Sequence, residues 1–288
     1  MLPFRKILFP VDFSDRCRAI APFVRQTVEK YEADLILLHA VDPVPLVMGS
    51  VEASVAMPLP DFVQMRKRQE ERLKEFDQEM FPGLKPTLMV EDGEPGRVVR
   101  DAIRHQGADL VMLPTHGHGA FRRFLLGSVT SKILHDVDCA VWTDVHHAES
   151  QPSFPYRSVL CALNLDSEET DAVIRAACSV AKKYEAELLL VHVVELPAAA
   201  WEVDYAPYRK AVLDAADEKM RRLRQETGIQ APYEIVEGRP AEEVRRMAQA
   251  RGADLIVTGR GHSQEGIGRA WSQLFPIIRE APCPVLSI

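Results

Sequence analysis

The sequence predicts an α/β protein built from two tandem, doubly wound, parallel five-stranded sheets. Short continuous apolar runs alternate with longer segments of helical period, which is typical of buried parallel strands connected by helices. The same succession occurs twice within 288 residues, and each copy is far longer than one repeat of a solenoid. We therefore expect two domains, residues 1–145 and 156–288, joined by a polar, proline-punctuated linker over residues 144–155.

Composition and charge limit the classes of function. A hydrophobic content of 47% with 27% charged residues is typical of soluble globular proteins. The net charge of −7 argues against a nucleic-acid binder, because neutralising phosphates needs a basic field. No apolar run approaches the roughly 18 residues of a membrane span, and nothing resembles a signal peptide, so we expect no membrane association and a cytoplasmic location. Five scattered cysteines indicate neither a disulfide framework nor a structural zinc site.

Local signals place the elements of the first half. Ser14 or Asp15 can cap a helix behind the first strand, Pro95 suits the first turn of a later helix, and Gly107 can end that helix. Residues 42–60 are proline-rich and aperiodic, so they form either a flap or a surface excursion. We expect strands over residues 6–11, 35–41, 87–90, 110–113 and 139–143, and helices over about 15–31, 61–80, 95–105 and 128–135.

The second half repeats these signals in the same order. Lys182–His192 is similar to Glu29–His39, since both sequences lead from a helix end into an apolar strand. The turn Glu237-Gly-Arg-Pro corresponds to Asp92-Gly-Glu-Pro. This correspondence predicts a duplicated domain.

The candidate functional stretch is residues 110–130, with the sequence LVMLPTHGHGAFRRFLLGSVT. It predicts a strand, a glycine loop and a helix start, a junction that favours anions because backbone N–H groups are accessible there. Ser128 and Thr130 add hydroxyls that suit phosphate oxygens. Ligands of such sheets bind outside the carboxyl ends of the strands, and Asp12 and Val41 lie at two further strand ends.

The spacing of Gly117, nine residues, then Gly127-Ser128 resembles the nucleotide-binding signature of the universal stress protein family. That signature runs Gly, two residues, Gly, nine residues, Gly-Ser/Thr. The resemblance covers nearly all of the chain as a tandem pair. It implies a strand order of 3-2-1-4-5, similar to the adenine nucleotide alpha hydrolases.

The resemblance also implies that the first domain binds ATP or a related adenine nucleotide, with Mg²⁺, in a regulatory stress-response role. Asp12 would lie near the ribose and adenine, and the backbone of Val41 would meet the adenine edge. Pro114 stands where the family has its first glycine, lacks an N–H, and fills space that glycine would leave for the ribose. The remaining nucleotide-binding positions are Gly117, His118, Gly127, Ser128, Val129 and Thr130.

The second domain departs from the signature. Asn164 occupies the place of Asp12, His262 falls where Gly117 does, and Trp271 replaces Gly127 just before Ser272. An indole at that point should block a phosphate. We therefore expect the second domain to be structural or adapted to another role, packed against the first as a pseudo-dimer partner. A homodimer of the whole chain stays open.

Two other functions stay open. One is a nucleotide-free interaction protein that acts through its surface or through residues 44–60. The other is a slow ATPase, because phosphoryl transfer needs mainly positioning and charge stabilisation. The sequence holds no P-loop lysine motif, nucleophile elbow or His-Glu-x-x-His motif, so we predict no enzyme beyond a weak ATPase.

Histidines do not predict a metal site. His116, His118, His146 and His147 have no carboxylate or thiol spaced to complete one. Two further histidines, His39 and His192, lie in apolar strands and are interpreted as satisfied core residues.

Overall fold

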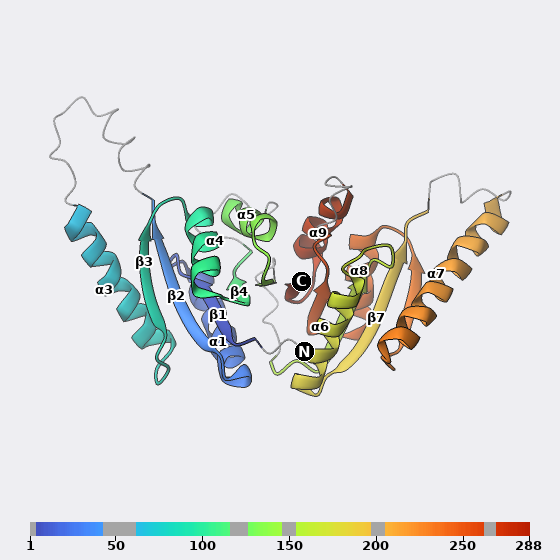
Figure 1. The fold of residues 1–288 in the computed structure, drawn as a ribbon, viewed down its shortest axis with the longest axis horizontal. Helices are drawn as coiled ribbons and strands as arrows, with labels where there is room; N and C mark the ends of the chain where they lie inside the picture. The colour runs from blue at the N-terminus through green and yellow to red at the C-terminus, as the bar shows by residue number, and fades with distance from the viewer. Residues whose placement is uncertain (1–3, 43–61, 116–125, 146–153, 197–204, 262–268) are drawn as a thin grey trace, which may run out of the picture. The chain divides into compact units, whose positions relative to one another are not determined.

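The computed structural model describes residues 4–42, 62–115, 126–145, 154–196, 205–261 and 269–288. The chain divides into two compact units close to residue 143. Each unit is an α/β domain with five strands, and Figure 1 shows the first in blue to green and the second in yellow to red.

The first unit contains a parallel sheet with the strand order β3-β2-β1-β4-β5. This order confirms the one that the family resemblance implies. Helices α1 and α3 pack against each other on one side of the sheet, and α4 and α5 pack together on the other. In chain order the elements are β1 (Lys6–Pro10), α1 (Asp15–Tyr31), β2 (Asp34–Val41), α3 (Phe62–Met80), β3 (Thr87–Asp92), α4 (Pro95–Gln106), β4 (Leu110–Leu113), α5 (Ser128–Asp136) and β5 (Ala140–Thr143).

The predicted helix signals are present in the first unit. The side chain of Ser14 caps α1 by accepting a hydrogen bond from the N–H of Cys17 at 3.1 Å. Pro95 lies in the first turn of α4, and Gly107 ends that helix with a φ of 65°, a left-handed conformation that glycine adopts without strain.

The second unit repeats the architecture, with the order β8-β7-β6-β9-β10. Numbered within its own unit, this is again 3-2-1-4-5. Figure 1 shows α7 and α8 on opposite sides of β7. In chain order the elements are β6 (Ser158–Leu163), α6 (Thr170–Tyr184), β7 (Glu187–Val194), α7 (Ala206–Thr227), β8 (Tyr233–Glu237), α8 (Pro240–Arg251), β9 (Leu255–Thr258), α9 (Arg269–Glu280) and β10 (Val285–Ser287).

The duplication extends to single hydrogen bonds. The carboxylate of Asp109 accepts bonds from the N–H groups that begin β1, and Asp254 does the same at the start of β6. The Nδ1 of His39 lies 2.7 Å from the carbonyl oxygen of Val11, and the Nδ1 of His192 lies 2.9 Å from that of Leu163. Because a carbonyl only accepts, both rings donate from Nδ1. Both histidines are therefore satisfied, as predicted, although each is only half-buried.

The cores of both units are formed by the strands and the apolar faces of the helices. Phe9 of β1 is fully buried and packs against Phe76 and Phe81 at ring-centroid distances of 6.4 and 6.1 Å. Among the described residues, no helix is both long enough and apolar enough to cross a membrane.

Candidate functional site

The first unit brings three predicted site positions to one edge of its sheet. Asp12 follows β1, Val41 ends β2, and Pro114 follows β4. Both neighbours of β1 run parallel to it, so the carboxyl ends of the three strands share an edge. The strand order reverses between β1 and β4, and this is the point where open α/β sheets form a ligand crevice.

Two hydrogen bonds tie the end of β4 to the start of α5. The N–H of Gly127 donates to the carbonyl of Thr115 at 2.9 Å. The buried hydroxyl of Thr130 donates to the carbonyl of Pro114 at 3.0 Å. The start of α5 therefore lies beside the carboxyl end of β4, and the hydroxyl proton of Thr130 is committed to this junction.

The first turn of α5 presents backbone donors. Its N-cap residue, Gly127, has no side chain with which to cap them and adopts an ordinary φ of −57°. Ser128 is exposed and Val129 is half-buried. Unsatisfied N–H groups and the partial positive charge of a helix start suit an anion.

Some predicted site positions lie outside the described residues. They are Gly117, His118, the segment 44–60 and His262. The backbone of Trp271 belongs to α9, but its side chain is not described. The roles assigned to these positions stay predictions.

Asp12 has a local structural role. Its Oδ1 accepts a hydrogen bond from the N–H of Ser14 at 2.9 Å, which forms an Asx turn leading into the cap of α1. The adjacent Phe13 has a φ of 60°, a backbone conformation that residues other than glycine rarely adopt. The turn behind β1 is therefore held in a specific, strained backbone geometry. The predicted contact between Asp12 and a ribose stays a prediction.

An aromatic cluster beside this turn escaped the sequence analysis. The ring of Phe13 lies 4.6 Å from that of His39, and the guanidinium carbon of Arg72 lies 4.3 Å from the centre of the Phe13 ring. Burial lowers the pKa of His39, so the ring is neutral at pH 7. The only sequence signal for this cluster was Phe13 directly after Asp12, because Arg72 comes from the distant helix α3.

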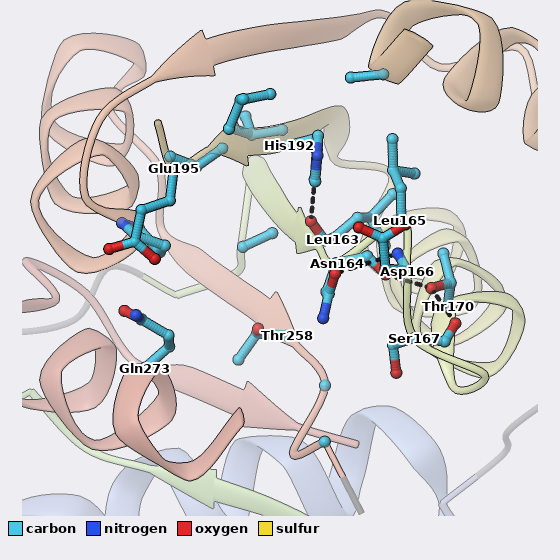
Figure 2. Close-up of a pocket in the computed structure, with 18 of the residues that line it drawn as sticks. Leu163, Asn164, Leu165, Asp166, Ser167, Thr170, His192, Glu195, Thr258 and Gln273 are labelled. Carbon is cyan, nitrogen blue, oxygen red and sulfur yellow. Dashed lines mark hydrogen bonds between the residues drawn. The ribbon is translucent and has the colours of Figure 1, made fainter. Parts of the chain in front are cut away.

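The second unit contains a cavity of about 1250 Å³. It opens at the carboxyl ends of β6, β7 and β9, and the first half of α7 forms one wall. Figure 2 shows Glu195 and Gln273 on one side of this space and Asn164, Asp166 and Ser167 on the other. The cavity thus lies at the edge equivalent to the predicted site of the first unit, in the domain that lacks the signature.

The turn behind β6 is built like the turn behind β1. Oδ1 of Asn164 accepts a hydrogen bond from the N–H of Asp166 at 3.1 Å, and its carbonyl accepts one from the hydroxyl of Thr170 at 2.5 Å. Asn164 therefore reproduces the local role of Asp12 without its charge. Burial lowers the pKa of His192, as it does for His39.

A carboxylate lies against the loop after β9. Oε2 of Glu169 accepts a hydrogen bond from the N–H of Gly261 at 2.8 Å. The same oxygen would lie 3.4 Å from a Cβ atom added to Gly259, and Arg260 between the two glycines is buried. The loop after β9 is the counterpart of the predicted phosphate loop after β4, so an anion from the chain itself already binds a loop amide here.

Metal ligands do not gather in the part of the chain that the structure describes. No group of three or more His, Cys, Asp or Glu side chains is placed to hold an ion there. The described cavity wall offers hydrogen-bond donors and acceptors.

The family model described as the universal stress protein family matches the chain twice, over residues 3–143 and 155–288. A universal stress protein of Thermus aquaticus is 28% identical over 141 residues, covering 48% of this chain and 96% of the relative. A universal stress protein of Methanocaldococcus jannaschii is 32% identical over 121 residues, covering 39% of this chain and 70% of the relative.

Solved structures share the fold over the whole chain. A universal stress protein from Archaeoglobus fulgidus superposes with a TM-score of 0.69 at 20% identity, covering 99% of this chain and 96% of its own. A universal stress protein from Pseudomonas aeruginosa gives a TM-score of 0.65 at 15% identity, with 99% and 93% coverage. At these identities the likeness establishes the α/β architecture in tandem.

Proposed function

The chain belongs to the universal stress protein family as a tandem two-domain member, and from this premise we propose that its first domain binds ATP or a related adenine nucleotide. The observation that carries the proposal is the junction of β4 and α5. There, two hydrogen bonds hold a helix start without a side-chain cap at the switch point of the sheet. Asp12 and Val41 follow or end strands at the same edge of the sheet. Such a junction suits a phosphate chain.

The phosphates would lie over the first turn of α5. The exposed hydroxyl of Ser128 and the N–H groups of Ser128 and Val129 are the proposed donors. Gly127 would contribute by lacking a Cβ, because its own N–H already binds Thr115. Mg²⁺, if bound with the nucleotide, would neutralise phosphate charge. Gly117 and His118 would complete the loop.

The base would lie against the ends of β1 and β2. The carbonyl of Val41 accepts a hydrogen bond from the N–H of Gly93 at 2.9 Å, which fixes the end of β2. A carbonyl oxygen has a second lone pair, and the adenine amino group can donate to it. Asp12 would accept from the ribose hydroxyls beside the turn that it forms with Ser14.

A nucleotide-free interaction protein is the second candidate, and a specific observation favours it. Four of the predicted ligand groups already have partners within the chain, namely Asp12, the Val41 carbonyl, the Gly127 N–H and the Thr130 hydroxyl. Pro114 is itself buried and has no N–H to offer. Mass spectrometry of the purified chain separates the candidates, because co-purified nucleotide would argue against this one.

A calorimetric titration with ATP and Mg²⁺ of the Gly127→Trp variant tests the proposed site. The φ of −57° at this position suits any residue, so the indole would occupy the phosphate space with little backbone strain. We expect binding by the native chain and none by Gly127→Trp, with a native circular dichroism spectrum for both. Equal affinity in the two proteins would refute the site.

A further inference from the structure

The turn behind β1 carries a strained backbone that its counterpart behind β6 lacks. Phe13 has a φ of 60°, a conformation that residues other than glycine rarely adopt. Leu165 follows Asn164 as Phe13 follows Asp12, and within the described part of the chain it is not among the residues with a positive φ. Both turns nevertheless form the same hydrogen bond, from a backbone N–H to the side chain two residues earlier, at 2.9 and 3.1 Å. The strain is therefore not needed to make this bond.

The packing of the Phe13 ring holds the strained conformation in place. The ring centre lies 4.6 Å from that of His39 on β2 and 6.0 Å from that of Phe76 on α3. The guanidinium carbon of Arg72, also on α3, lies 4.3 Å from the ring centre, a distance at which a cation is attracted to an aromatic face. These three side chains form the Phe13 clamp. A strained residue persists where its surroundings impose the conformation, and here a strand and a helix do so together.

Asp12 is thereby fixed from both sides. On one side the Nδ1 of His39 donates a hydrogen bond to the carbonyl of Val11 at 2.7 Å, and the N–H of Val11 donates to the carbonyl of Leu38 at 2.8 Å. On the other side the same His39 ring contacts Phe13. The backbone is therefore tied to β2 immediately before and immediately after Asp12.

The second unit keeps the histidine but not the clamp. His192 donates to the carbonyl of the residue that precedes Asn164, at 2.9 Å. Leu165 offers no ring to a cation, and Lys219 of α7, which lines the same cavity as Leu165, forms an ion pair with Asp166. The strain and the clamp thus occur together in the unit that retains the carboxylate and the glycine signature.

We propose that Phe13 is a positioning residue of the nucleotide site: the Phe13 clamp holds its backbone in the strained conformation and so directs the Asp12 carboxylate at the ribose hydroxyls. This inference rests on the proposed nucleotide binding by the first domain. Phe13 acts through Asp12, because its own ring already packs against His39 and Arg72. The turn is then ordered before the ligand arrives, which reduces the entropy lost on binding.

Calorimetric titrations of the full chain with ATP and with 2′,3′-dideoxy-ATP, both with Mg²⁺, test this role. The second nucleotide lacks the ribose hydroxyls that Asp12 would bind. Phe13→Leu, which copies the second unit, removes the ring from the clamp. We expect it to lower ATP affinity at least about fivefold and to leave dideoxy-ATP affinity within about twofold, which also shows that the variant is folded. A purely structural role would lower both affinities alike, and that result would overturn the inference.

An Asp12→Ala background isolates the path from Phe13 to the ribose. Asp12→Ala alone should lower ATP affinity about tenfold or more. Phe13→Leu added to it should change ATP affinity by less than about twofold, because the group that it positions is gone. An equal effect of Phe13→Leu with and without Asp12 would overturn the inference. If the native chain bound no ATP, the proposed function would fail and this inference with it; if the native chain and Phe13→Leu bound ATP equally well, only the inference would fail.

The cation of the clamp is tested by Arg72→Met. Arg72 is exposed, so we expect ATP affinity to fall only about two- to fivefold, with dideoxy-ATP affinity unchanged. Arg72→Lys keeps the charge and should keep most of the ATP affinity, whereas an equal loss for both nucleotides in Arg72→Met would indicate a phosphate contact and overturn the role of Arg72 in the clamp. Phe23→Leu is the matched control, since Phe23 is a half-buried ring of α1 that stacks on Trp142 at 6.5 Å. It should change neither affinity, and a loss equal to that of Phe13→Leu would contradict the inference.

Discussion

Thr130 and Ser128 lie two residues apart at the start of α5, and the structure predicts opposite consequences for their loss. Thr130→Val removes the buried 3.0 Å hydrogen bond to the Pro114 carbonyl and leaves that buried acceptor without its donor. Leaving a buried group unsatisfied costs about 1–3 kcal/mol. In a domain of this size each kcal/mol lowers Tm by roughly 2–4 °C, so we expect a fall of about 2–12 °C.

Ser128→Ala is the matched change. Its side chain is exposed, and the N-cap position belongs to Gly127. The free energy of unfolding should therefore stay within about 0.5 kcal/mol of the native value. Loss of a hydrogen bond to a charged phosphate costs about 1.5–3 kcal/mol, so ATP affinity should fall roughly 10- to 100-fold.

Thermal melts by circular dichroism and calorimetric titrations with ATP, made on both variants, measure the two effects separately. An unchanged Tm for Thr130→Val would refute the structural role of the buried hydrogen bond. An unchanged ATP affinity for Ser128→Ala, measured where the native chain binds, would refute the phosphate position.

Two further predictions concern stability. Burial lowers the pKa of His39 and of His192, so both rings are neutral in the folded protein at pH 7. The free energy of unfolding is therefore unaffected by these groups above their unfolded pKa of about 6.5. It decreases as the pH falls from there through the folded pKa, because the unfolded chain binds the protons more readily. Tm should fall between pH 7.5 and pH 5, and less in the double variant His39→Asn, His192→Asn; an equal fall in both proteins would contradict the assignment. Gly238→Ala should lower the free energy of unfolding by about 1–3 kcal/mol, because the φ of Gly238 is +147° and a Cβ would lie 2.6 Å from Cγ of Glu243. Gly228→Ala is the control, since Gly228 has a φ of +70° and open space around it, and it should lower the free energy clearly less. Urea unfolding measures both losses, and equal losses would contradict the role of the Glu243 contact.

Much of the fold could be predicted from the sequence because its signals are local. Apolar runs mark buried strands, and Ser14, Pro95 and Gly107 mark helix ends through contacts within a few residues. The internal repeat then fixed the number of domains. The strand order of each sheet came from the family resemblance, and the structure confirms it.

Several features of the candidate sites could not be predicted, because they depend on contacts between distant segments. The sequence offered Thr130 as a phosphate ligand, but only the packed fold shows its hydroxyl on the carbonyl of Pro114. The cavity of the second unit depends on how α7 packs beside β7, and the carboxylate of Glu169 reaches a loop 92 residues away. Substitutions such as Asn164 indicated that this domain differs, but they did not indicate that it holds an open cavity.

We propose that the first domain binds an adenine nucleotide although Pro114 replaces a glycine of the family signature. The most direct test is a calorimetric titration of the native chain with ATP and Mg²⁺, repeated on Pro114→Gly. Glycine retains the carbonyl that accepts the Thr130 hydroxyl, so the junction of β4 and α5 should persist in the variant. We expect saturable binding by the native chain, with equal or higher affinity in Pro114→Gly. Binding by the variant alone would contradict it, because Pro114 would then have closed the site and left a nucleotide-free interaction protein.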